Sequence, residues 1–142
     1  AGLGALVERV AREVPVARLD DARVLAEAEA FVCDYVSTWR KVERGEWIAA
    51  QRWLHHQLIE ANLRLLHELR LRGGRVSFPD GRRLERLGEE LAADATVKAA
   101  PDRESLRSAL ARCADLHRRL VGRLLGNAWS WPDLSGLRLG GE

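Results

Sequence analysis

Apolar residues recur along most of the chain at the three- and four-residue spacing of an amphipathic α-helix. The clearest run begins after a capping carboxylate at Asp20 or Asp21, extends to about Glu43 and stops before Gly45. Its apolar face consists of Val24, Ala28, Phe31, Val32, Tyr35, Trp39 and Val42. The same spacing predicts further helices over residues 4–13, 46–72, 82–92 and 102–125. No segment alternates apolar and polar residues convincingly enough to predict a β-strand.

These segments predict an all-α fold: an antiparallel bundle of four main helices plus a short helix. The connection at Gly45 is so short that the two helices it joins should be antiparallel neighbours. The 142 residues suit a single domain, with its core at 19–125 and a tail at 126–142. Because Trp129 and Trp131 are too apolar to remain in water, we expect the tail to pack on the bundle at least to Leu134.

Composition narrows the class of protein. Hydrophobic residues make up 46% and charged residues 31%, which is normal for a globular domain. The formal net charge of only +2 argues against a dedicated nucleic-acid-binding domain. No apolar run approaches the roughly 20 residues of a membrane span, and no signal peptide is visible, so we expect a cytoplasmic protein without a membrane partner. Cys33 and Cys113 form no CxxC pair and are expected to be buried thiols.

Arginines are dense around the end of the third predicted helix and the segment that follows it. Acidic residues are interleaved with them, so a salt-bridged, solvated face is the first interpretation, and a surface for phosphate or an acidic partner is the alternative. The basic residues are Arg64, Arg70, Arg72, Arg75, Arg82, Arg83 and Arg86, and the acidic ones are Glu68, Glu85, Glu89 and Glu90.

No complete catalytic motif is present: the sequence contains no P-loop, GxGxxG, HExxH, GxSxG or EF-hand pattern. His56, Glu60 and His67 could line one helix face, but ordinary polar positions explain them better, and we expect no metal site. Arg112 and His117 have a spacing that could serve a ribonuclease, with histidine moving the proton and arginine stabilising the phosphorane. The alternative is a solvated arginine beside a half-buried histidine.

Three tryptophans lie near the turn between the second and third predicted helices: Trp39, Trp47 and Trp53. Trp53 departs from the main apolar stripe of its helix. Such a side chain either packs in the core or lines a groove that meets a ligand or partner.

The region of this turn resembles the C-terminal helical domain of bacterial nucleotidyltransferases related to the aminoglycoside-modifying enzymes. In that family a Lys-x-x-Arg-Gly step ends one helix, a long Ala-rich helix follows, and a basic Arg-Leu segment comes after a loop. The residues that carry the resemblance are Lys41, Arg44, Gly45, Ala49, Ala50, Leu54, Arg82, Arg83 and Leu84. The likeness spans roughly residues 19–125, including the last long helix.

The resemblance implies a substrate-side domain without chemistry of its own. The family's catalytic domain carries a Gly-Ser motif and paired aspartates, which this sequence lacks. Nucleotide and Mg²⁺ are therefore expected only with a catalytic domain in cis or in trans, and this chain should hold no cofactor. The family's helical domain lines the acceptor cleft, often with acids, so a small-molecule acceptor is expected here. The candidate binding residues are Asp34, Tyr35, Trp39, Trp53 and His56.

Two other interpretations stay open. The bundle fold is shared with HEPN domains, some of which are ribonucleases with an Arg-x4–6-His motif that Arg112 and His117 would match. Cys113 follows the arginine where those motifs usually have a polar residue. The third interpretation is a helical interaction module, with a homodimer built on the region of Trp39, Trp47 and Trp53.

Overall fold

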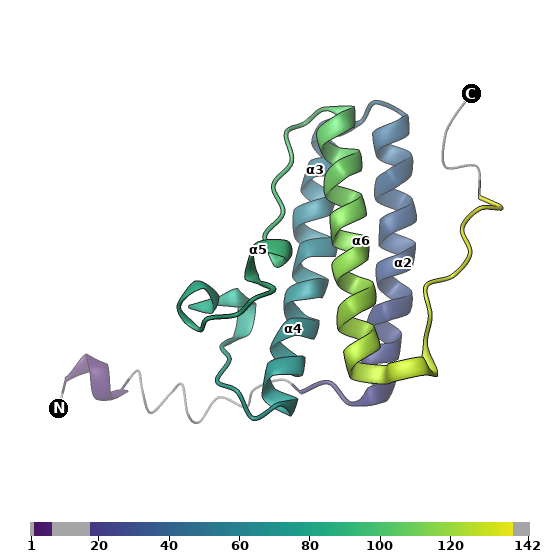
Figure 1. Cartoon of the computed structure of the whole chain (residues 1–142). Coiled ribbons are helices and arrows are strands. Elements are labelled where there is room, and N and C mark those ends of the chain that lie inside the picture. Colours follow the sequence, from purple (N-terminus) through teal and green to yellow (C-terminus); the bar gives the residue numbers. More distant parts are fainter. Residues whose placement is uncertain (1, 7–17, 138–142) are drawn as a thin grey trace.

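Three long helices lie side by side in the computed structural model, which describes residues 2–6 and 18–137. They are α2 (Asp21–Glu43); a continuous helix formed by α3 (Trp47–Trp53), the π-helical turn η1 (Leu54–Ile59) and α4 (Glu60–Arg72); and α6 (Arg103–Leu125). The colours of Figure 1 show that α2 runs opposite to the other two helices. The described residues contain no strand, so the predicted all-α class is confirmed.

The ends of these helices follow from local capping chemistry. The Asp20 carboxylate accepts a hydrogen bond from the Arg23 amide at 2.8 Å and begins α2. Asp102 does the same for α6 with the Ser105 amide, also at 2.8 Å. Gly45 adopts φ +78° after α2, a left-handed conformation that glycine enters without a steric penalty. The predicted bounds of the first, second and last long helices are therefore confirmed to within a residue or two.

The middle of the predicted 46–72 helix departs from regular α geometry. Residues 54–59 form a π-helical turn, which closes each hydrogen-bonded ring with one more residue than an α turn. Leu54 and Leu58 are fully buried at the two ends of this stretch. The three residues between them, His55, His56 and Gln57, are all exposed. The turn thus presents a polar group on the outer face while the apolar positions stay in the core.

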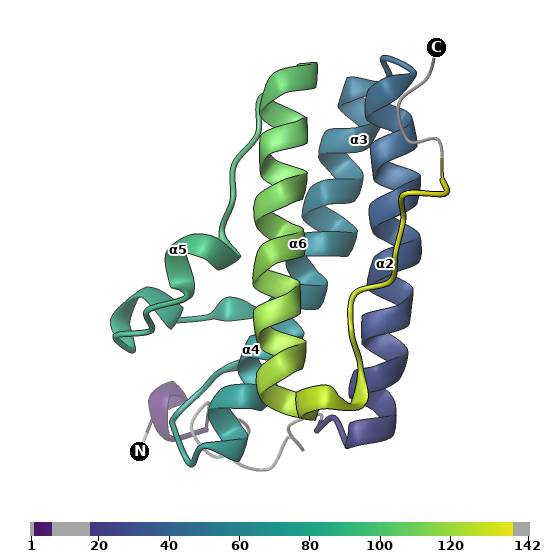
Figure 2. The same cartoon turned by 45° about the vertical axis from the view of Figure 1, so that its right-hand side comes forward.

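The helix predicted over residues 82–92 is wrong, and the bundle has no fourth long helix. Asp80 and Arg83 both have φ +60°, and Gly88 has φ +64°, values that an α-helix cannot contain. The chain instead forms short elements, namely the 3-10 turns η2 (Pro79–Gly81) and η3 (Leu84–Arg86) and the four-residue helix α5 (Ala92–Ala95). Residues 73–102 therefore form an irregular crossover that returns to the start of α6, so α6 runs parallel to α3 and α4 (Figure 2).

A buried ion pair holds the crossover against α4. The Arg70 guanidinium donates to the Glu89 carboxylate and to the Val76 carbonyl, and the exposed fractions of the two charged side chains are 5% and 1%. Burial would raise the pKa of Glu89. Hydrogen bonds from the Leu91 amide and Arg70, together with the charge of Arg75, outweigh that effect and lower it.

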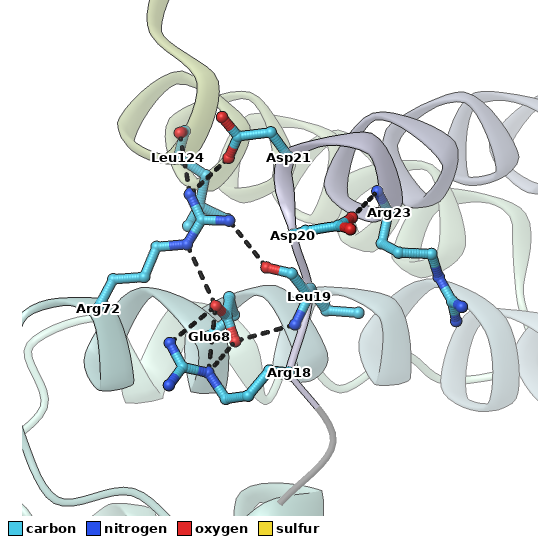
Figure 3. A network of polar contacts seen from close by, with 8 residues as sticks. All are labelled: Arg18, Leu19, Asp20, Asp21, Arg23, Glu68, Arg72 and Leu124. Carbon is cyan, nitrogen blue, oxygen red and sulfur yellow. Dashed lines mark hydrogen bonds and ion pairs between the residues drawn. The ribbon is translucent and has the colours of Figure 1, made fainter.

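A second buried carboxylate joins three parts of the chain (Figure 3). Glu68 on α4 is 2% exposed and accepts hydrogen bonds from Arg18 at 3.0 Å, the Leu19 amide at 3.2 Å and Arg72 at 3.2 Å. Arg72 also donates to Asp21 at the start of α2 and to the carbonyls of Leu19 and Leu124. The predicted salt-bridged arginine face is confirmed for Arg64, Arg70, Arg72 and Arg75. Arg82, Arg83 and Arg86 form no ion pair among the described residues, and the central acids, Glu68 and Glu89, are buried.

The tail packs on the bundle as predicted. Trp129 and Trp131 lie over the seam between α2 and α6, and Figure 2 shows this segment running alongside α2. The Trp131 ring meets Phe31 at a centroid distance of 6.2 Å and Tyr35 at 5.2 Å, in edge-on contacts. Leu134, the expected limit of the packing, is half-buried.

Three smaller expectations have different outcomes. Cys113 is buried as predicted, but Cys33 is exposed because it lies on the outer flank of α2, so that prediction is wrong. Of the helix predicted over 4–13, residues 4–6 are helical and the rest lie outside the described residues. None of the helices that the structure describes is both long enough and apolar enough to cross a membrane.

Replacing Trp131 by alanine should lower the free energy of unfolding by about 2 kcal/mol, because it uncovers Phe31 and the core beneath it. Urea titration followed by far-UV circular dichroism measures this loss. Leu137→Ala is the control in the same tail, since Leu137 is 40% exposed and its loss should change stability by less than about 0.5 kcal/mol. Equal effects of the two substitutions would contradict the packing of the tail.

Glu89→Ala should lower the free energy of unfolding by about 3 kcal/mol at pH 7, because it leaves the Arg70 charge buried without its partner. Glu46→Ala breaks the exposed pair with Arg44 and should cost below about 1 kcal/mol. The pKa of Glu89 lies below its ordinary 4.5, so its stabilisation is present above that pH and is lost as the pH falls further. The difference between wild type and Glu89→Ala should therefore shrink below pH 4.5 in urea titrations.

Candidate functional site

The predicted binding residues divide between the two sides of α2. Tyr35 and Trp39 face α6 and the tail, where Tyr35 meets Trp131 and the Arg107 guanidinium lies 5.7 Å from the Trp39 ring centre. Burial raises the pKa of Tyr35, and the charge of Arg118 offsets a part of this. These two aromatic side chains are half-buried parts of the packing under the tail.

Asp34 lies on the other side of α2, toward α4. Burial raises the pKa of its carboxyl, the nearby Arg64 charge lowers it, and Glu27 raises it again. Arg64 itself is bound by Glu27 through two hydrogen bonds of 2.8 and 3.2 Å. Asp34 therefore lies beside an ion pair whose cation is already bound by Glu27.

Trp53 and His56 lie together on the surface of α3 and η1. They line a surface hollow of about 340 Å³, here called the Trp53 hollow, whose other lining residues are Ala49, Arg52 and Gln57. Lys41 reaches across from α2, and its ammonium lies 4.1 Å from the centre of the Trp53 ring. The Lys41 ammonium also donates to the Ser37 hydroxyl at 3.3 Å. The structure thus joins two of the five predicted residues into one site.

The Trp53 hollow has one aromatic wall and cationic or amide groups around it. Arg52 and His56 are exposed, and Trp53 is half-buried. Arg52 makes no ion pair with any residue among 2–6 and 18–137, so its guanidinium is available to a ligand. Gln57 adds an amide that can both donate and accept.

Sequence reasoning did not single out Arg52 and Gln57. The signal was their spacing, because Arg52 and His56 are four residues apart, as are Trp53 and Gln57, and both pairs lie on one helix face. Lys41 entered only through the family resemblance, and its contact with Trp53 depends on how α2 packs against α3.

The structure does not bring Arg112 and His117 together. Five residues apart on α6, they point about 140° from one another. Arg112 is exposed, with Asp94 3.8 Å away, whereas His117 is fully buried and stacks on Phe31 at a ring distance of 3.7 Å. The Asn62 amide nitrogen donates to the Cys113 carbonyl. The amide oxygen of Asn62 can therefore accept a hydrogen bond from Nδ1 of His117 at 3.0 Å. This geometry does not favour a ribonuclease pair.

The environment of His117 also fixes its charge. Burial lowers its pKa to about 3, and the backbone of Ala28 offsets only part of that effect. The imidazole is therefore neutral at physiological pH. An inaccessible neutral ring with aromatic neighbours is a core residue of the bundle.

No metal site is found in the part of the chain that the structure describes. No three side chains of His, Cys, Asp or Glu there lie close enough to hold an ion. His67, one of the three residues considered for such a site, instead forms a hydrogen bond of 2.7 Å between Nδ1 and the Ser77 hydroxyl.

The chain was compared with known protein families, with curated proteins and with solved structures, and none of them matches.

The pH dependence of stability should report the buried His117. Its pKa is about 3 in the folded protein and 6.5 ordinarily, so the unfolded state binds the proton first. The contribution of neutral His117 to the free energy of unfolding is therefore complete above pH 6.5. This contribution decreases at lower pH, by roughly 2 kcal/mol between pH 6.5 and 5. Urea titrations at these pH values should show a flatter pH dependence for His117→Gln than for wild type. Parallel curves would contradict the neutral, buried ring.

Proposed function

We propose that this chain is a helical binding domain without catalytic chemistry of its own, which acts on the substrate side of a nucleotidyltransferase catalytic domain in cis or in trans. One observation carries the proposal. His117, the histidine of the ribonuclease pair considered above, is buried in the core, whereas the aromatic and cationic Trp53 hollow is exposed. This exposed surface would recognise a ligand.

The position of the resemblance supports the same conclusion. Lys41, Arg44 and Gly45 form the end of α2 and the turn after it, and Ala49 lies in the first turns of α3. Lys41 contacts Trp53, and Ala49 lines the hollow. Two of the nine residues that carry the resemblance, Lys41 and Ala49, therefore lie at the Trp53 hollow, which supports the proposal.

The purified chain should transfer no nucleotide when it is incubated with each α-labelled nucleoside triphosphate, Mg²⁺ and candidate acceptors, because the transfer chemistry belongs to the catalytic domain. Intact mass spectrometry of the native gene product tests the second half of the proposal. A mass well above 15.9 kDa, or a co-purifying nucleotidyltransferase chain, is expected.

Two results would contradict the proposal. One is nucleotide transfer by the chain alone that survives repurification. The other is a native product of about 15.9 kDa that co-purifies with no nucleotidyltransferase. Cleavage of RNA that is lost in His117→Gln but kept in Arg86→Gln would instead favour the ribonuclease interpretation.

A further inference from the structure

We infer that the Trp53 hollow binds a small phosphate ester whose ester group is a flat ring. This inference rests on the proposed function and names the chemical class of the ligand. It is carried by the charge around the hollow, the presence of Trp53 in its lining and the backbone that presents its side chains.

The charge of the hollow selects an anion. Arg52 offers a planar fork of donors that matches a phosphate, and Lys41 supplies a second positive charge beside the Trp53 ring. Neither Arg52, His56 nor Gln57 has a carboxylate partner among the described residues. A phosphate ester carries about −1.5 to −2 charges near pH 7, which the Arg52 guanidinium in the hollow would offset, with Lys41 nearby at the Trp53 ring although not among the lining residues.

No acid lines the hollow to oppose this charge. Two carboxylates before α3 are paired with other residues, Glu43 with Arg107 at 2.6 Å and Glu46 with Arg44 at 2.6 Å. Glu60 follows His56 by one turn but is not among the lining residues. A cationic acceptor, which acids of the related helical domains would attract, is therefore disfavoured at this surface.

The Trp53 indole favours a ligand that carries a flat aromatic ring. Lys41 covers one face of the indole at 4.1 Å, and the ring forms a wall of the hollow. A bound cation polarises the indole, and a flat aromatic group can stack on or against it while its phosphate reaches Arg52. A volume of about 340 Å³ lies at the lower end of the range for ligand pockets, about 300–1,000 Å³, and suits a single ring with one phosphate.

The π-helical turn fixes the arrangement. Leu54 and Leu58, both fully buried, anchor η1 in the core. His56 and Gln57 project from this anchored stretch, and Arg52 projects from the turn before it. Irregular π turns inside helices occur often at functional sites, because they place side chains where a regular helix would not.

Two-dimensional ¹H–¹⁵N NMR of the chain tests the inference with three probes: phenyl phosphate, inorganic phosphate and phenol. The five tryptophans give separate indole signals, and the Trp53→Phe spectrum assigns the one that matters. Phenyl phosphate should shift the Trp53 indole and the Gln57 side-chain amide in a saturable way. It should bind at least about tenfold more tightly than inorganic phosphate, while phenol should give no saturable shift.

Arg52→Gln should weaken phenyl phosphate binding by about tenfold, because it removes the fork of donors. Arg86→Gln is the matched control: Arg86 is exposed on η3 in the crossover and lines no part of the hollow, so binding should be unchanged. Amide spectra of both variants show whether the fold is kept. Lys41→Gln gives an independent reading of the second charge and should weaken binding to a similar extent.

Three outcomes would overturn the inference: no saturable shift at Trp53, equal binding of phenol and phenyl phosphate, or equal weakening by Arg52→Gln and Arg86→Gln. If inorganic phosphate binds as tightly as phenyl phosphate, the claim that the ligand carries a flat ring is overturned. These measurements use the chain alone and involve no transfer, so they can fail while the association with a catalytic domain is confirmed, and the reverse also holds.

Discussion

The buried ion pair between Arg70 and Glu89 determines the path of the chain between α4 and α6. A charge taken out of water must find a partner of opposite sign and further hydrogen bonds, and here Val76 and Leu91 supply them from the crossover backbone. Residues 73–102 can therefore be irregular and still be fixed. The crossover ends at the start of α6. It therefore positions the third long helix that encloses the core.

Apart from the buried charges described above and Thr38, the polar side chains buried among the described residues are Asn62 and His117, which form a short polar line in the core. Asn62 joins the Cys113 carbonyl to the ring of His117, and Phe31 stacks flat on that ring at 3.7 Å. Trp129 and Trp131 cover the same ring from the tail, edge-on, at 5.7 and 6.3 Å. The tail thus extends the core, because its two tryptophans shield the His117 side chain from water.

The parts of the fold that depend on local chemistry could be predicted from the sequence. Asp20, Asp102 and Gly45 act on their own neighbours, so the helix ends they define were predicted well. The helix over 82–92 failed because Leu84 is buried from the 3-10 turn η3 and Leu91 from the position before α5, while Glu89 pairs with Arg70 of α4. The π turn has no sequence signature that periodicity detects.

The candidate site was predictable only in part, for a related reason. Trp53 departs from its helical stripe, which left open whether it packs in the core or lines a groove. Its contact with Lys41 and the absence of a partner for Arg52 depend on the packing of α2 against α3, which no local pattern encodes. Tyr35 and Trp39 were assigned to a ligand because the sequence predicted that the tail packs on the bundle but not that Trp131 contacts Tyr35.

The parallel course of α4 and α6 has an electrostatic consequence. Each helix carries a partial negative charge at its carboxyl end, and two such ends lie together where α4 and α6 stop. Only the amino end of α2 lies there to compensate. Arg70, Arg72 and Arg123 occupy the last turns of the two helices, and Arg72 donates directly to the Leu124 carbonyl at the end of α6. Arg72 in particular thus supplies positive charge where two aligned helix dipoles end.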